Sequence, residues 1–303
     1  MVGQIVEITK QGCSLRKFRG FMEISEDGVM LGRVSLDDIA SVVISVLGCS
    51  ISTKLVNALA ELNIPIVMCG SNYLPTSITL PVAGYGRQLH VMQAQVNMSE
   101  PRRKRLWQKI VRSKIQNQAA VIDRIGESNQ RLLRLAASVR SGDAGNAEAQ
   151  AARDYWRKLF GKGFRRKQEN VDPINSALNY SYAIVRSCVA RGVSSTGLHP
   201  CFSLHHKHPQ NPINLVDDLM EPYRPIADYF LVLRAGKLGK KLTPDMKAEL
   251  AALTTLPIPQ GTEESPLSLS VVKMCRQVAR YYQDETNEVA LPELPYPLQA
   301  IAG

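Results

Sequence analysis

The chain has 303 residues, of which 45% are hydrophobic, so it is long enough to bury the core of one large domain or two ordinary ones. This composition indicates a folded, soluble protein. The net charge of +10 favours polyanionic partners, nucleic acid before acidic membrane. The alternative is a basic protein that binds no polyanion.

The positive charge is concentrated in one part of the chain. Residues 1–86 carry six Lys and Arg against seven Asp and Glu, a net charge of −1, so residues 87–303 carry +11. An excess confined in this way is typical of a binding surface.

Cysteine usage and hydropathy indicate a cytoplasmic protein without a membrane partner. The six cysteines are scattered and form no CxxC pair, which is typical of a reducing cytosol. The N-terminal residues lack the basic and apolar regions of a signal peptide. The longest apolar run, near residues 39–49, is too short and too rich in serine to cross a bilayer.

The first part of the chain is predicted to be rich in β-strands. Short β-branched runs, most of them set off by turn residues, indicate strands at residues 3–8, 21–24, 28–34, 40–46 and 65–70. The pattern at residues 53–63 is helical, with Ser50 or Ser52 as the cap. We interpret residues 77–86, which end in Pro and Gly, as a linker.

The remainder of the chain is predicted to be helical. Ser99 and Pro101 mark the start of a long helix. Further helical patterns cover residues 128–140, 147–160, 173–191, 226–238, 244–250 and 265–282, and a proline-rich tail that we expect to be flexible covers residues 292–303. We therefore expect an α+β protein with a small β-rich domain, residues 1–86, and a larger all-α domain, residues 87–303.

The long helix that starts near Ser99 has an apolar face and a basic face. The apolar residues recur at the three-and-four spacing of a buried face: Leu106, Trp107, Ile110, Val111, Ile115, Ala119 and Ile122. The neighbouring face carries a stripe of four cations: Arg102, Arg105, Lys109 and Arg112. Such a stripe can follow a phosphate backbone, or it can be a solvated face.

Metal-binding residue types concentrate in residues 204–225. Three histidines are followed by three acids: His205, His206, His208, Asp217, Asp218 and Glu221. Imidazole and carboxylate are ligands of divalent cations, so the segment is a candidate metal site. Asp218 lies three residues and Asp217 four residues before Glu221, so either pair could grip an ion from one face of a helical turn.

Several other interpretations of the same segment stay open. Solvated charges at a helix start are the commoner explanation of such a cluster. Pro222 and Pro225 predict a kink or an irregular turn, because each lacks an N–H donor and crowds the preceding turn. A zinc site is also conceivable, but the four residues that would form it lack the paired spacing of structural zinc modules: His199, Cys201, His206 and His208. A catalytic triad of Ser203, His206 and Asp218 has no support from the sequence, because no GxSxG motif surrounds the serine.

Three ordered motifs resemble one family. They are EAQAARDYWRKLFG (148–161), FRRKQENVDPINSALNYSYAIVRSCVARG (164–192), and the stretch from His206 through LVDDLMEPYRP to residue 225. Together they resemble the CRISPR-associated DNA integrase, the subunit that inserts new spacers during prokaryotic adaptation. The Pro-Tyr-Arg-Pro that follows Glu221 is similar to the type II branch.

The resemblance implies a set of site residues. The metal ligands would be Glu148, His206 and Glu221, which would also be the catalytic residues, with Asp218 as a neighbouring acid that supports them. We choose His206 over His205 because the family's histidine lies twelve residues before the equivalent of Asp218. Taken by position alone, Glu148 is explained as a helix-start acid stabilised by the macrodipole.

The resemblance also implies an activity and its partners. One Mg²⁺ or Mn²⁺ would promote attack on a phosphodiester by a 3′-hydroxyl or by water, and the nitrogen ligand favours Mn²⁺. The partners would be double-stranded DNA (the spacer precursor and the CRISPR repeat), a second copy of the chain bound through the N-terminal domain, and a small ferredoxin-like partner dimer. The basic stripe and the loop residues Arg165, Arg166 and Lys167 would hold phosphates. Two rivals are a metal-dependent repair nuclease and a non-enzymatic nucleic-acid-binding scaffold.

Overall fold

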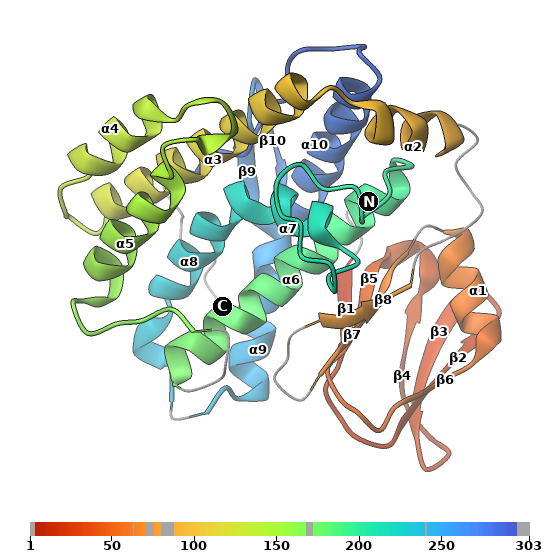
Figure 1. Cartoon of the computed structure of the whole chain (residues 1–303). Helices are drawn as coiled ribbons and strands as arrows, with labels where there is room; N and C mark the ends of the chain where they lie inside the picture. The colour runs from red at the N-terminus through yellow and green to blue at the C-terminus, as the bar shows by residue number, and fades with distance from the viewer. Residues whose placement is uncertain are drawn as a thin grey trace.

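The computed structural model describes residues 4–62, 64–70, 75–79, 88–167, 172–239 and 241–295. A β-rich N-terminal part lies to one side of a larger helical part, so the predicted α+β class is confirmed (Figure 1). The predicted boundary at residue 86 falls outside the described residues. Among the described helices, none is long and apolar enough to cross a membrane.

Two four-stranded sheets make up the N-terminal part. The first has the order β1-β5-β7-β8, parallel except at its last pair, with strands Gln4–Ile8, Ile39–Ile44, Ile66–Cys69 and Pro75–Ile78. The second has the order β4-β3-β2-β6, with strands Val29–Ser35, Phe21–Glu26, Cys13–Phe18 and Ser50–Ile51. Helix α1 (Thr53–Glu61) packs against β2, and its cap is Ser52, whose side chain accepts a hydrogen bond from the Leu55 N–H.

The helical part is built around two long helices, α3 and α6. Its helices are α2 (Gln88–Asn97), α3 (Glu100–Arg124), α4 (Gln130–Ser138), α5 (Ala147–Phe160), α6 (Pro173–Ser195), α7 (Asn214–Met220), α8 (Arg224–Val232), α9 (Pro244–Ala251) and α10 (Leu267–Tyr282). Short 3₁₀ turns are η1 (Leu36–Asp38), η2 (Ser141–Asp143), η3 (Glu221–Tyr223), η4 (Ala235–Lys237) and η5 (Ala252–Thr255). Helix α3 contacts α4, α5, α8 and η3, and α6 contacts α7, α8, α9, α10 and strand β5.

The predicted apolar face of α3 is confirmed, because all seven of its residues are buried. Helix α6 is buried along most of its length and connects the two parts of the molecule (Figure 1). At that junction the hydroxyls of Ser41 and Ser187 lie 3.5 Å apart, and the Tyr180 hydroxyl donates to the Glu7 carboxylate.

Four local predictions need correction. Strand β2 was not predicted, because its sequence CSLRKF has no β-branched residue, and helix α2 was not predicted either. Strand β8 occupies the start of the segment interpreted as a linker. The helix expected over residues 226–238 ends at Val232.

The larger part of the molecule is not entirely helical, and its described C-terminal residues are packed. A hairpin of β9 (Pro257–Gln260) and β10 (Glu263–Pro266) precedes α10. Leu294, in the segment expected to be a flexible tail, is buried. Its N–H donates to Asn117 Oδ1 at 3.0 Å, and Asn117 Nδ2 donates to the carbonyls of Pro222 and Pro292 at 2.9 Å each. One buried amide on α3 therefore fastens both η3 and the C-terminal segment.

Replacing Asn117 with alanine should destabilise the protein by about 3 kcal/mol, because it removes three buried hydrogen bonds, from the Leu294 N–H and to the carbonyls of Pro222 and Pro292. Urea unfolding followed by circular dichroism measures the change. The matched control is Gln116→Ala, at the exposed neighbouring position on the same helix. Equal stability of the two variants would show that the amide does not fasten the segment.

Candidate active site

Glu148 is placed by the start of α5. It lies in the first turn of the helix, as predicted. The turn is capped by the Asp143 carboxylate, which accepts from the N–H groups of Ala147 and Glu148 at 2.8 and 3.1 Å. A cap of this kind satisfies donors that otherwise have no partner in a first helical turn. The backbone of Glu148 is therefore fixed, while its side chain extends towards α3.

Glu221 is placed by an irregular turn between two helices. The chain passes from α7 through the 3₁₀ turn η3 into α8, which confirms the irregular turn predicted from Pro222 and Pro225. The Glu221 side chain is 5% exposed, and its Oε1 lies 3.0 Å from Arg224 Nε. Burial would raise the pKa of Glu221, but the positive charges of Arg224 and Lys114 outweigh it and hold the pKa below its ordinary value.

Lys114, on α3, joins the two carboxylates. Its Nζ lies 2.6 Å from Glu148 Oε1 and 2.5 Å from Glu221 Oε2, and its side chain is 12% exposed. Burial would lower the pKa of Lys114, but the charges of Glu221 and Glu148 outweigh it and raise the pKa. Lys114 was not among the predicted site residues. Position 114 nevertheless continues the apolar spacing of Ile110 and Val111, which indicates a buried position.

Asp218 orients His206. The fully buried Asp218 carboxylate accepts from the backbone N–H groups of Leu204, His205 and His206, and it lies 2.6 Å from His206 Nδ1. Both of its oxygens are thus in use, so the structure fits the supporting role expected of Asp218 and not direct ligation of a metal. With Nδ1 held in this way, Nε2 is the ring nitrogen left for a ligand.

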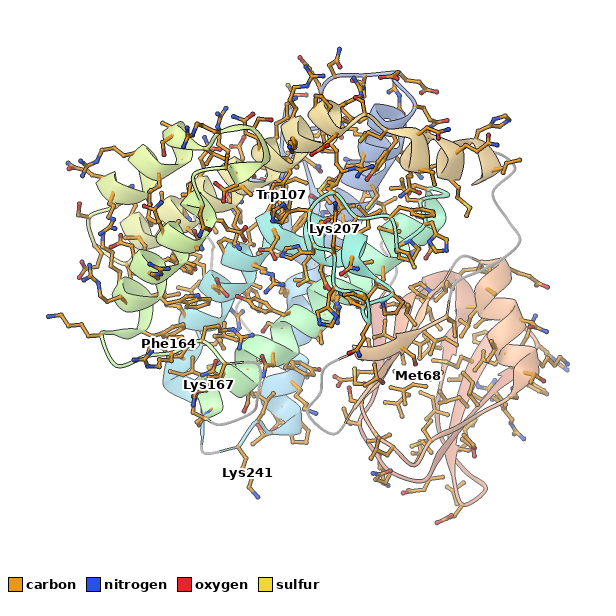
Figure 2. The ribbon with its side chains drawn as sticks, viewed as in Figure 1. Met68, Trp107, Phe164, Lys167, Lys207 and Lys241 are labelled. Atoms are coloured by element: carbon orange, nitrogen blue, oxygen red, sulfur yellow. The ribbon has the colours of Figure 1, made fainter. Side chains whose placement is uncertain are left out.

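The neighbouring histidines have other contacts. The His205 ring stacks on Trp107 with centroids 4.5 Å apart and an interplanar angle of 1°. The His199 ring contacts Phe202, and the Cys201 thiol donates to the Pro212 carbonyl. Trp107 lies on α3 beside the loop that carries Lys207 (Figure 2). His206 is therefore the histidine of the loop that a buried acid orients.

The predicted ligands do not form a closed metal cage. Within the described residues, no group of three or more His, Cys, Asp or Glu side chains is arranged to hold a metal ion, and this applies to the zinc set as well. The residues nevertheless suit a hard divalent cation, since an ammonium group already lies between the two carboxylates. Glu221 Oε2 is buried, and the group that faces it is the Lys114 ammonium at 2.5 Å.

A cavity of about 370 Å³ adjoins Glu221 and His206. Three arginines contribute to its lining: Arg166, Arg186 and Arg224. Arg166, from the loop between α5 and α6, turns inward and donates to the side-chain oxygens of Asn175 and Asn179 at 3.1 and 2.7 Å. Arg165 and Lys167 on the same loop stay exposed, and Figure 2 shows Lys167 near Phe164. Of the three predicted loop cations, only Arg166 reaches the cavity.

The predicted basic stripe on α3 is only partly open to solvent. Arg102 donates to the carbonyls of Tyr281 and Thr286 and pairs with Asp284 at 3.0 Å, which leaves its side chain 13% exposed. Lys109 donates to the Asn287 carbonyl at 2.7 Å, and Arg112 to that of Val139 at 3.5 Å. Arg105 remains exposed. The chain that follows α10 therefore covers part of this face.

Comparison with known proteins shows the family. The family model described as CRISPR associated protein Cas1 matches residues 6–243. The CRISPR-associated endonuclease Cas1 of Neisseria meningitidis serogroup C (strain 8013) is 45% identical over 221 residues, which cover 72% of either chain. The chain belongs to the Cas1 family.

Solved structures share the Cas1 fold seen here. A casposase bound to integration product matches with a TM-score of 0.76 and 18% identity, over 98% of this chain and 94% of that one. A chain of a Cas6-RT-Cas1–Cas2 complex matches with a TM-score of 0.77 and 15% identity, over 98% of this chain and 36% of that one. At these identities the likeness shows the fold alone.

The Asp218 contact makes a prediction about the titration of His206 in this Cas1 chain. The hydrogen bond to Asp218 raises the pKa of His206; burial lowers it, and the charges of Asp218, Glu221 and Glu148 raise it further. The raised pKa means that the charged pair stabilises the fold fully below pH 6.5, and that this stability is lost as the pH rises through the folded pKa.

Asp218→Asn should lower the pKa of His206, because it removes the acceptor charge and leaves burial to act. A pH titration followed by NMR of ¹⁵N-labelled histidine, in chelator-treated buffer, measures it. The control is Asp217→Asn, which removes the adjacent acid that pairs with Arg186. An unchanged pKa in Asp218→Asn would contradict the assignment of Asp218 as the group that orients His206.

Proposed function

We propose that this protein is a divalent-metal-dependent DNA integrase and endonuclease that inserts spacer DNA into a CRISPR array. Two observations support the proposal: Lys114 joins Glu148 to Glu221, and the imidazole of His206, held by Asp218, lines an arginine-containing cavity together with Glu221. Two names among the similar proteins support it: a Cas1 relative is called an endonuclease, and a casposase is described with its integration product.

Glu148, His206 and Glu221 would hold one Mg²⁺ or Mn²⁺, with Mn²⁺ favoured by the nitrogen ligand. When bound, the metal polarises a phosphodiester and helps to activate a hydroxyl for attack. Attack by the 3′-hydroxyl of incoming DNA forms one phosphodiester bond as the target bond breaks and releases a new 3′-hydroxyl. Attack by water breaks the bond without joining. Asp218 acts through His206, as the group that fixes the orientation of its ring.

The charges of the cavity fit a DNA backbone. Arg166, Arg186 and Arg224 bring guanidinium groups to the wall beside Glu221, and guanidinium matches phosphate geometry with paired donors. We assign these three to phosphates near the reacting bond. The exposed cations Arg105, Arg165 and Lys167 suit phosphates farther along the duplex, so binding should weaken steeply with salt.

We also propose a homodimer and a small ferredoxin-like partner dimer. The partner is supported by the solved complex that is described as containing Cas1 and Cas2. The homodimer is supported by β4, which lies at the edge of its sheet and exposes Val29, Met30 and Leu31. An edge strand with exposed apolar residues is a surface for association with another chain.

The function predicts loss of chemistry without loss of fold. Glu148→Gln, His206→Ala and Glu221→Gln should each reduce strand joining by about 100-fold or more, because each removes a ligand from the reacting centre. The assay supplies a labelled duplex with a free 3′-hydroxyl and a repeat-containing target, with Mn²⁺. The control is Glu127→Gln, at an exposed position.

The same assay distinguishes the rival functions. A repair nuclease would cut the target without joining the supplied end. A non-enzymatic scaffold predicts that Glu148→Ala and His206→Ala behave like the unaltered protein in every reaction. Joining that depends on these residues excludes both.

The dimer proposal predicts that Leu31→Glu yields a monomer, because a carboxylate on the edge strand opposes burial against a second copy. Light scattering after size-exclusion chromatography measures the mass. Leu133→Glu, at an exposed leucine of α4, is the matched control and should leave the mass unchanged. A Leu31→Glu protein that remains dimeric would move the interface elsewhere.

A further inference from the structure

The position of Lys114 has a consequence for metal binding. Its ammonium nitrogen lies within 2.6 Å of one oxygen each of Glu148 and Glu221. A bound Mg²⁺ would approach the same oxygens at about 2.1 Å. Lysine and metal therefore compete for the same pair of carboxylates.

The charges around the two carboxylates are already balanced without a metal. Glu148 and Glu221 contribute two negative charges, and Lys114 and Arg224 contribute two positive ones within 3.0 Å. All four side chains are at most 30% exposed. A divalent ion would therefore add a charge of +2 to a neutral and largely dehydrated cluster, which is unfavourable unless a negative group enters with it.

A DNA phosphate is the negative group that the site lacks. It would enter through the adjoining cavity, whose wall includes Arg224 and Glu221. There it could accept hydrogen bonds from a guanidinium and add negative charge next to the metal position. Arg224 contacts both the carboxylate cluster and the cavity, since it pairs with Glu221 and lines the cavity wall.

We propose that Lys114 is a built-in counter-ion that closes the metal site in the free protein, so that the divalent ion binds together with DNA. The proposal rests on the metal-dependent function proposed above. Because the coupling of two ligands is reciprocal, DNA must tighten metal binding by the same factor by which metal tightens DNA binding. Lys114 is a positioning residue in this account, since it acts on the carboxylates.

The test is direct binding of Mn²⁺ to the whole protein, followed by the electron paramagnetic resonance signal of free Mn²⁺. It is performed with and without a short DNA duplex, and Mn²⁺ bound by the duplex alone is subtracted. Lys114→Met should tighten Mn²⁺ binding to the DNA-free protein by about tenfold or more. DNA should tighten binding to the unaltered protein by a similar factor and to Lys114→Met far less.

Two further variants separate the charge from other effects. Lys104→Met removes a lysine from the same helix, one that is exposed and pairs with Glu100 at 2.7 Å, and should leave Mn²⁺ affinity unchanged. Lys114→Arg keeps the charge and should keep weak binding in the absence of DNA. Thermal unfolding of Lys114→Met with and without Mn²⁺ follows the fold, and Mn²⁺ should raise its midpoint more than that of the unaltered protein.

The possible outcomes test the role of Lys114 separately from the metal-dependent function on which it rests. If Lys114→Met and the unaltered protein bind Mn²⁺ equally without DNA, or gain equally from DNA, Lys114 is not the counter-ion, while the metal-dependent function stands. If no variant binds Mn²⁺ even with DNA, the metal-dependent function itself fails. Tight binding by Lys114→Met that Glu148→Gln abolishes supports both.

Discussion

A carboxylate as buried as that of Glu221 stays ionised only when positive charge lies against it. Lys114 and Arg224 supply that charge from α3 and from the start of α8. The lysine that neutralises Glu221 also forms a second ion pair, because Lys114 contacts Glu148 at the start of α5. Three segments far apart in the sequence are thus held to one point by a single ion network. Removing any one of its charges leaves the remaining charges of this largely buried network unbalanced.

Helix α3 supplies the frame on which this network is built. Trp107, Lys114 and Asn117 follow one another at intervals of seven and three residues, so they lie along one side of the helix. Trp107 supports the histidine loop, Lys114 joins the carboxylates, and Asn117 fastens η3 and the C-terminal segment. A packing helix therefore also sets the geometry of the site. The position of Glu221 depends on it twice, through Lys114 and through the carbonyl of the next residue.

Local sequence patterns predicted much of this fold, but not what covers each surface. The buried face of α3 could be predicted because the spacing of hydrophobic residues indicates which side of a helix is buried. The partial covering of the basic stripe on the next face was not predicted, since the residues that cover Arg102 lie some 180 positions away. Lys114 was missed because a lysine reads as a surface residue unless its partners are known. Ligand roles came from resemblance, whereas the orientation of His206 by Asp218 required the structure.

The cavity wall and the two carboxylates form regions of opposite charge within one site. Tyr182 supports the basic region: its ring lies 5.1 Å from the Arg166 guanidinium and 4.9 Å from that of Arg224, and its hydroxyl donates to Asp228 at 2.6 Å. Burial raises the pKa of Asp228 to about 7, so near neutral pH this acid is only partly ionised. It therefore offsets less of the arginine charge than an exposed carboxylate would. The arginine side of the cavity thus stays positively charged while Glu221 and Glu148 carry negative charge beside it, and the Arg224–Glu221 pair is the boundary between the two regions.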